Sequence, residues 1–210
     1  MRMQWRDLLF AHWAVDAAAL RTLIPEGLDL DLFEGRAYVG VVPFSMRNVT
    51  PRWLPAVPGL DAFPELNLRT YVTVAGRPGV WFFSLDAGQK LAVRVARRLF
   101  HLPYFDARFT VSKAGGDVEY SAVRTHRRAA GAKFSASYRP AGGVYRATAG
   151  SLDSWLTERY CLYAMDRAGQ VYRGEIDHPP WPLQPATAEV SVNTLGERLG
   201  IEMSGPPQAL

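Results

Sequence analysis

The amino-acid sequence predicts a mainly β protein of the α+β class, in which a twisted antiparallel sheet or barrel carries a few short outer helices. Two observations predict this fold class. Short segments in which apolar and polar residues alternate recur along most of the chain, as expected for strands. About three short helical segments lie between them, without the regular strand–helix alternation that is typical of a parallel α/β sheet.

A short helix and a hairpin are predicted near the N-terminus. Residues 16–23 favour a helix with Asp16 as its N-cap, and Pro25 follows its end. Leucines alternate with acids from 28 to 32, which indicates a strand. Glu34-Gly35 predicts a turn, and residues 36–44 predict the returning strand of a hairpin.

A second hairpin and a basic helix are predicted in the middle of the chain. Strands 66–75 and 80–86 flank Gly76-Arg77-Pro78-Gly79, which we interpret as a four-residue loop. Residues 89–101 predict an amphipathic helix with its basic side in solvent. The remaining expected elements are a Pro- and Trp-rich surface loop at 47–59, strands at 105–112, 118–124, 133–139, 161–165, 171–176 and 188–192, and a helix at 151–160 capped by Ser151.

The strand that begins near residue 65 has one polar face. Side chains alternate along a strand, so Glu65, Asn67, Arg69 and Tyr71 share a face, and pairing across the four-residue loop places Arg69 opposite Asp86. This face looks at solvent if the sheet is half-solvated. It lines a cavity if the sheet curls into a barrel. The alternation alone leaves both alternatives open.

Composition limits the class of protein. The chain of 210 residues fits one domain, which we expect to span 1–204 with a flexible tail at 205–210. The single Cys161 favours a reducing, cytoplasmic location, and no apolar stretch has the length of a membrane span. The net charge is +4, but the basic residues are spread out and no nucleic-acid-binding motif is present. We therefore expect neither nucleic acid nor membrane as a partner.

No motif for a metal or cofactor is present. The four histidines, His12, His101, His126 and His178, lack metal-ligand spacing, and no glycine-rich phosphate loop follows a strand. We therefore expect no metal and no cofactor. His178 precedes Pro179-Pro180-Trp181, a stiff loop that either closes over a pocket or packs as a rigid connection.

Arg159 is a further candidate for ligand binding. It lies at the end of a predicted helix, where the helix dipole favours a basic residue in any case.

Three collinear segments resemble acetoacetate decarboxylase. Residues 11–28 contain an aromatic strand, the Asp-capped helix with Ala19-Leu20-Arg21, and a Pro-containing turn. Phe63-Pro64-Glu65 resembles the segment of the pocket glutamate, and residues 95–103 resemble the helix before the lysine pair. More closely, the whole chain resembles the uncharacterised YqjF-like bacterial proteins of the acetoacetate decarboxylase-like superfamily, through its residues 64–71 (PELNLRTY) and 178–185 (HPPWPLQP).

This resemblance implies the same sheet or barrel with a changed active site. It places the pocket arginine at Arg6 and the pocket glutamate at Glu65. The catalytic lysine and its neighbour fall on Tyr104 and Phe105, which have no amine to form a Schiff base. Lys90 is the nearest alternative amine, and we expect it to face water. The chain is therefore not expected to be a Schiff-base decarboxylase.

The sequence supports three hypotheses about function. In the first, Arg6, Glu65, Asn67, Arg69 and Tyr104 line a pocket for a small anionic or carbonyl metabolite, with Arg159 and His178 as further binding residues. Glu65 then carries a proton, Tyr104 polarises a carbonyl, and an arginine holds the anion. In the second, the same pocket binds or senses a ligand without catalysis. In the third, the sheet or a Trp-rich surface docks another protein; its tryptophans are Trp53, Trp81 and Trp181. We also expect self-association into a homo-oligomer.

Overall fold

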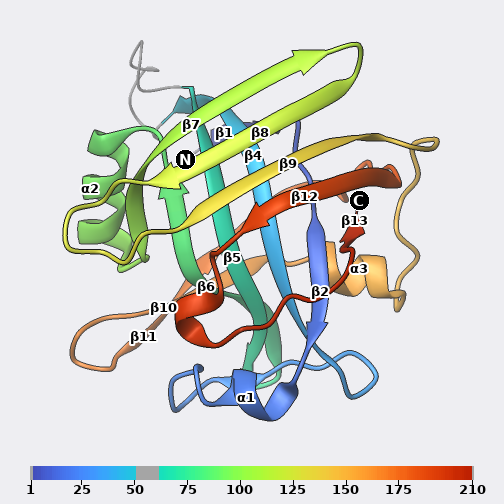
Figure 1. Ribbon diagram of the computed structural model, residues 1–210. Coiled ribbons are helices and arrows are strands. Elements are labelled where there is room, and N and C mark those ends of the chain that lie inside the picture. Colours follow the sequence, from blue (N-terminus) through green and yellow to red (C-terminus); the bar gives the residue numbers. More distant parts are fainter. Residues whose placement is uncertain (1, 51–61, 210) are drawn as a thin grey trace.

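A computed structural model describes residues 2–50 and 62–209 (Figure 1). Within these ranges the strands form one 13-stranded sheet with the principal order β12-β9-β8-β7-β6-β5-β4-β2-β13. The strands are β1 (Arg2–Arg6), β2 (Ala11–Val15), β3 (Asp29–Leu30), β4 (Ala37–Thr50), β5 (Phe63–Val74), β6 (Arg77–Ala87), β7 (Tyr104–Ala114), β8 (Asp117–Arg124), β9 (Lys133–Pro140), β10 (Cys161–Met165), β11 (Val171–Glu175), β12 (Ala186–Asn193) and β13 (Gln208–Ala209). The helices are α1 (Ala17–Arg21), α2 (Lys90–Phe100), α3 (Leu152–Thr157) and the 3₁₀ helix Glu197–Leu199.

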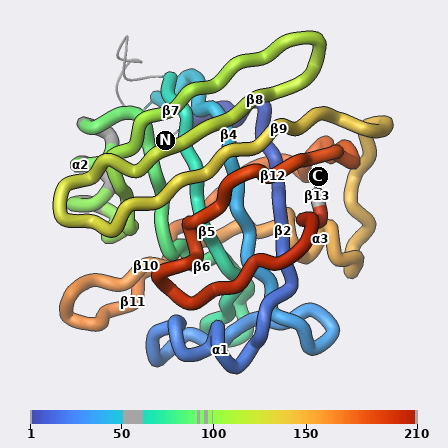
Figure 2. Tube along the Cα trace, in the orientation of Figure 1, coloured from blue at the N-terminus to red at the C-terminus, as the bar shows by residue number. Residues whose placement is uncertain are grey.

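The sheet folds over into two layers. β7, β8, β9 and β12 cross in front of β2, β4, β5 and β6, as the Cα trace also shows (Figure 2). Apolar side chains from both layers fill the space between them. These include Val41 and Leu66 from the rear layer and Tyr120 and Phe134 from the front layer, each at most 1% exposed. The mainly β prediction is confirmed, but the sheet is mixed, because β6 pairs in parallel with β7 and β10.

The capping predictions for two helices are confirmed. Asp16 accepts a hydrogen bond from the Ala19 backbone nitrogen (2.6 Å) at the start of α1. Ser151 accepts one from the Ser154 backbone nitrogen (3.2 Å) at the start of α3. The basic helix and the strands predicted after it are also confirmed as α2 and β7 to β12, with small differences at their ends.

The first predicted hairpin is wrong in its pairing. β3 has two residues and pairs with β5, whereas β4 pairs with β2 and β5. Only an isolated bridge between Phe33 and Arg36 closes the expected turn. The predicted loop at 47–59 is also wrong at its start, because Arg47–Thr50 continue β4 beside β1. Its remainder, 51–59 with Trp53, lies outside the described residues.

The second hairpin has a shorter turn than predicted. β5 and β6 are joined by Ala75 and Gly76, which both have positive φ (50° and 73°), as a tight two-residue hairpin turn requires. This turn shifts the register, so Arg69 lies opposite Phe82. The predicted Arg69–Asp86 pair is therefore wrong.

The C-terminal segment, expected as a flexible tail, makes contacts with the sheet. Trp13 Nε1 donates a hydrogen bond to the Gly205 carbonyl oxygen (3.0 Å). Gln208 and Ala209 form β13, which pairs with β2.

Candidate functional site

The polar face of β5 is buried. Glu65, Asn67, Arg69 and Tyr71 share this face as the alternation predicts, and none is more than 5% exposed. Of the two alternatives for this face, solvent is therefore wrong. The covering is not a closed barrel, however, because the interior between the two layers takes the apolar side chains of β5. The Arg69 end of the polar face is covered instead by α3 and residues that follow it, whereas Tyr104 of β7 lies against Glu65.

Arg69 is a buried cation without a counter-charge. Its Nη2 donates to the Leu156 carbonyl oxygen (3.1 Å) and weakly to the Tyr71 hydroxyl (3.4 Å). Its Nε has no hydrogen-bond partner, and no carboxylate in the described part of the chain forms an ion pair with it. The guanidinium lies over the rings of Phe10 and Tyr71, at 5.2 and 5.6 Å from their centroids. An uncompensated buried charge is costly, and ring contacts recover only part of that cost.

His12 belongs to this cluster, although sequence reasoning gave it no role. It comes from β2, and its Nε2 shares a hydrogen bond with the Tyr71 hydroxyl (2.7 Å), which itself donates to the Leu156 carbonyl (2.9 Å). Burial and the nearby Arg69 charge hold the pKa of His12 well below 6.5, so the ring is neutral. Gly40 makes room for it, because a Cβ there would lie 3.0 Å from the ring. No sequence signal marks this His among the four.

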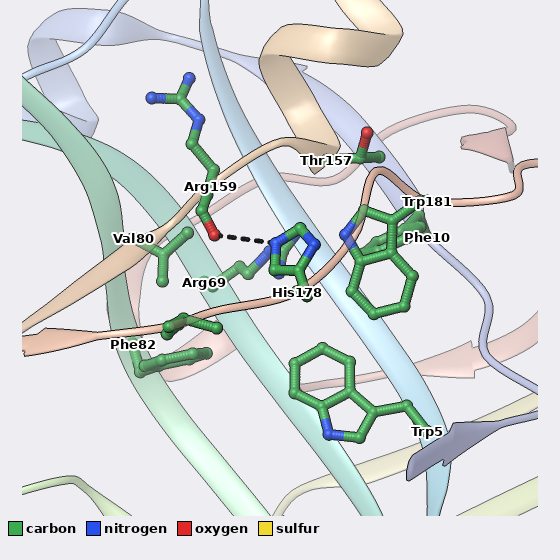
Figure 3. Close-up of a pocket in the computed structure, with 10 residues that line it drawn as sticks. Trp5, Phe10, Arg69, Val80, Phe82, Thr157, Arg159, His178 and Trp181 are labelled. Carbon is green, nitrogen blue, oxygen red and sulfur yellow. Dashed lines mark hydrogen bonds between the residues drawn. The ribbon is translucent and has the colours of Figure 1, made fainter. Parts of the chain in front are cut away.

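A small cavity lies at the Arg69 end of this face. Its volume is about 20 Å³, room for about one water molecule. Figure 3 shows the aromatic side chains at its wall. The lining residues are Trp5, Phe10, Arg69, Val80, Phe82, Thr157, Arg159, Ile176, His178 and Trp181. Three of the predicted binding residues thus line the cavity: Arg69, Arg159 and His178.

Arg159 and His178 contribute differently from Arg69. The Arg159 guanidinium is 4% exposed and pairs with Asp31 (2.6 Å), so its charge is compensated. In Figure 3 it points away from Trp181 and Trp5, while its carbonyl oxygen faces His178. His178 Nε2 lies 3.3 Å from that oxygen, and the ring stacks on Tyr160 (4.5 Å between centroids). His178 and Trp181 of the loop at 178–181 thus line the cavity, and the stacking on Tyr160 also fits the alternative of a rigid connection.

Glu65 and Tyr104 form a second polar pair farther along β5. The Tyr104 hydroxyl donates to Glu65 Oε2 (3.1 Å). Burial raises the pKa of Glu65 from 4.5 to about 8, against the lowering effect of the Tyr104 hydrogen bond, and the Asp86 charge adds to the rise. Burial of the hydroxyl and the neighbouring Glu65 raise the pKa of Tyr104 well above 10. Glu65 therefore holds a proton at neutral pH, but neither residue lines the cavity.

The strong ion pair of this region lies on the other face of the sheet. Asp86 accepts two hydrogen bonds from Arg124 of β8, both 2.7 Å long. Burial raises the pKa of Asp86, while the Arg124 contacts oppose this rise. The guanidinium also lies 4.2 Å from the centroid of the Phe105 ring. This pair ties β6 to β8 behind the Glu65–Tyr104 contact.

Of the two remaining predicted site residues, Asn67 lies on the buried face of β5 and Arg6 does not. Arg6 is exposed, and its Nη2 donates to Gln4 Oε1 (3.1 Å). The alternation of β1 instead turns Trp5 inward, where it contacts Phe44. The structure therefore does not bring Arg6 to the buried face. Asn67 lies between Glu65 and Arg69 on β5, and its Oδ1 has no partner among the described residues.

All three lysines of the chain are exposed. They are Lys90 at the start of α2, Lys113 on β7 and Lys133 on β9. Lys113 forms an ion pair with Asp7. No amine of a lysine thus lies in the buried site.

The described tryptophans do not form one surface. Trp181 lines the small cavity, whereas Trp81 lines a second, mostly apolar cavity of about 290 Å³ beside β6 and β10. Within 2–50 and 62–209, no three His, Cys, Asp or Glu side chains converge as metal ligands would. None of the helices in these ranges is long and apolar enough to cross a bilayer.

Comparisons with solved structures agree on the fold. Acetoacetate decarboxylase from Legionella pneumophila matches with a TM-score of 0.61 at 11% identity, over 100% of this chain and 82% of that chain. The enduracididine biosynthesis enzyme MppR, complexed with a condensation product of pyruvate and imidazole 4-carboxaldehyde, matches with a TM-score of 0.66 at 15% identity, over 96% and 80%. At these identities the likeness shows the fold alone, which is acetoacetate decarboxylase-like.

Sequence comparisons identify the family. The uncharacterized protein YqjF of Bacillus subtilis (strain 168) is 49% identical over 203 residues, which are 97% of this chain and 83% of that protein. The model of the DUF2071 family, described as an uncharacterized conserved protein (COG2071), matches residues 2–210. The chain therefore belongs to the DUF2071 family, and its own fold is acetoacetate decarboxylase-like.

Proposed function

We propose that this protein binds a small organic anion in the cavity beneath residues 178–181, with Arg69 as the counter-charge. The observation that carries the proposal is the burial of this guanidinium without a carboxylate partner. A ligand anion compensates the charge that the fold leaves unpaired. The free Nε donor fits the forked geometry in which arginine holds a carboxylate.

We further propose Glu65 as a proton carrier and Tyr104 as the group that polarises a ligand carbonyl. A general acid is most effective when its pKa lies near the working pH, and the pKa of Glu65 is about 8. The substrate carbonyl would have to reach the pair along the β5 face, past the unpartnered Asn67 Oδ1. Schiff-base decarboxylation is not part of the proposal, because the position implied for the lysine holds Tyr104 and the three lysines are exposed.

The second candidate function is ligand binding or sensing without catalysis. It is favoured by the position of Glu65 and Tyr104 outside the cavity. Consumption of a stabilising ligand, followed by NMR in wild type and Glu65→Gln, separates the two candidates. Turnover that Glu65→Gln abolishes supports the proton carrier, and a bound ligand that is never consumed supports the sensor.

We also propose a location and an oligomeric state for the protein. Residues 1–204 act as one domain in the cytoplasm, which the single free Cys161 supports. The protein also self-associates, which sedimentation velocity tests directly.

The binding proposal is tested by thermal denaturation with acetate, lactate, pyruvate and acetoacetate. A ligand that binds only the folded state raises the Tm with increasing concentration. We expect this rise in wild type and in Arg108→Gln, which removes an exposed arginine of β7. We expect none in Arg69→Met, which keeps the side-chain length and removes the charge. An equal rise in Arg69→Met would contradict the proposal.

A further inference from the structure

We propose that the ligand is an aromatic monocarboxylate, whose carboxylate lies against Arg69 and whose ring enters the stack formed by Phe10, Trp181 and Trp5. This inference rests on the proposed role of Arg69 as the counter-charge of an anion. It specifies that the ligand has an aromatic ring and a single negative charge. It requires no carbonyl group and no amine chemistry.

The first support is a continuous run of rings that begins at the cation. Arg69 lies over Phe10, and Trp181 meets Phe10 edge-on at 5.6 Å and 80°. Trp181 in turn stacks on Trp5 at 5.4 Å and 25°, and lies 4.9 Å from His178. Rings at these separations are in contact with one another, and a ligand ring that takes the place of one of them would make the same kind of contact. A ligand anchored at Arg69 therefore has aromatic walls for its body.

The second support is the net charge of the buried groups. Arg159 is paired with Asp31, and His12 is neutral beside Arg69. Of the two arginines that line the cavity in the described part of the chain, Arg69 is the one without a carboxylate partner. A monoanion neutralises it, whereas a dianion leaves a buried negative charge that again costs free energy. The site therefore favours a monocarboxylate over a dicarboxylate or a phosphate.

The third support is how the cavity is closed. At about 20 Å³ it admits no ring while Trp181 stacks on Trp5. The Trp181 backbone nitrogen donates a hydrogen bond to Glu158 Oε1 (2.9 Å), His178 Nε2 lies 3.3 Å from the Arg159 carbonyl oxygen, and Arg146 donates to the Pro180 carbonyl oxygen. A ligand ring that enters between the indoles replaces one ring contact by another. Binding is thus coupled to a displacement of Trp181, which its fluorescence reports.

The experiment compares five probes by calorimetry and by intrinsic fluorescence. Benzoate and indole-3-acetate carry both ring and charge, acetate lacks the ring, benzamide lacks the charge, and phthalate carries a second charge. We expect benzoate and indole-3-acetate to bind at least about tenfold more tightly than the other three, which is about 1.4 kcal/mol, and to change the tryptophan emission. Two variants separate the contributions of ring and charge. We expect Trp181→Leu to bind benzoate no more tightly than acetate. We expect Arg69→Met to bind neither anion.

Other binding results would overturn the aromatic ligand, the single charge or both proposals. If acetate and pyruvate bind as tightly as benzoate and depend on Arg69, the binding proposal stands and the aromatic ligand is overturned. If benzamide or phthalate equals benzoate, the assignment of one charge to the site is overturned. If no anion binds in an Arg69-dependent manner, both proposals fail. A full ring preference in a folded Trp181→Leu variant also overturns the inference.

Discussion

Glu65 and Arg69 lie on one face of β5 and respond to burial in different ways. The pKa of Glu65 rises to about 8, so this side chain becomes neutral at physiological pH. Arg69 cannot give up its proton and stays charged. The fold therefore presents a neutral acid and a cation on the same strand. This asymmetry suits a ligand whose anionic end lies at Arg69.

Glu65 should make the stability of the protein depend on pH. Between about pH 4.5 and about 8 the folded state holds a proton that the unfolded chain has released. The free energy of unfolding should therefore fall as pH rises through this window, by up to about 1.4 kcal/mol per pH unit, and level off above it. Urea denaturation at about pH 5, 6, 7 and 8 measures this slope. Glu65→Gln should reduce it.

Some slope should remain in the Glu65→Gln variant, because burial also raises the pKa of Asp86. Glu119→Gln is the matched control, since Glu119 is exposed on β8 and its loss should leave the slope unchanged. Parallel profiles for wild type and Glu65→Gln would show that Glu65 is already ionised in the folded state.

At the level of elements, the alternation of β5 could be predicted because it is local. A period of two needs only the identity of consecutive residues. The register could not be predicted, because Ala75 does not signal the positive φ that the two-residue turn gives it. The covering of the polar face could not be predicted either. Leu156, which bonds to Arg69, lies 87 residues away in sequence.

The turn between β5 and β6 gives a test of this explanation. Left-handed backbone is strained for alanine and well tolerated by asparagine. Ala75→Asn should therefore raise the free energy of unfolding by about 1 kcal/mol. Gly115 occupies a similar two-residue turn between β7 and β8 with a φ of 56°. Gly115→Ala should therefore lower the free energy of unfolding. Urea denaturation measures both, and a neutral or negative effect of Ala75→Asn would contradict the observed turn.

For the whole molecule, the family and fold could be inferred from the chain, whereas the place of Arg6 could not. The resemblance implied a pocket arginine there, but the alternation of β1 turns that side chain outward. The arginine on the buried face of β5 is Arg69. Glu65 and Tyr104, on which the resemblance placed two pocket groups, are hydrogen-bonded to each other.

The protein should also form no covalent Schiff-base adduct with a ketone. An amine that condenses with a ketone at neutral pH needs a desolvated or strongly cationic site, and the three lysines are exposed. Acetoacetate with borohydride should therefore leave the intact mass unchanged. Formaldehyde with borohydride, which methylates accessible amines, is the positive control for the reagent. A single adduct that disappears in Lys90→Arg would refute this expectation.

The most direct test of the central claim is the stability of Arg69→Met without any organic anion. A cation kept for a ligand destabilises the empty protein, so its removal should raise the free energy of unfolding above that of wild type. The Leu156 carbonyl keeps its hydrogen bond from Tyr71, so the substitution leaves this acceptor paired. Urea denaturation in low-salt buffer measures the difference. A loss of several kcal/mol would show that Arg69 is a structural cation and would contradict the account.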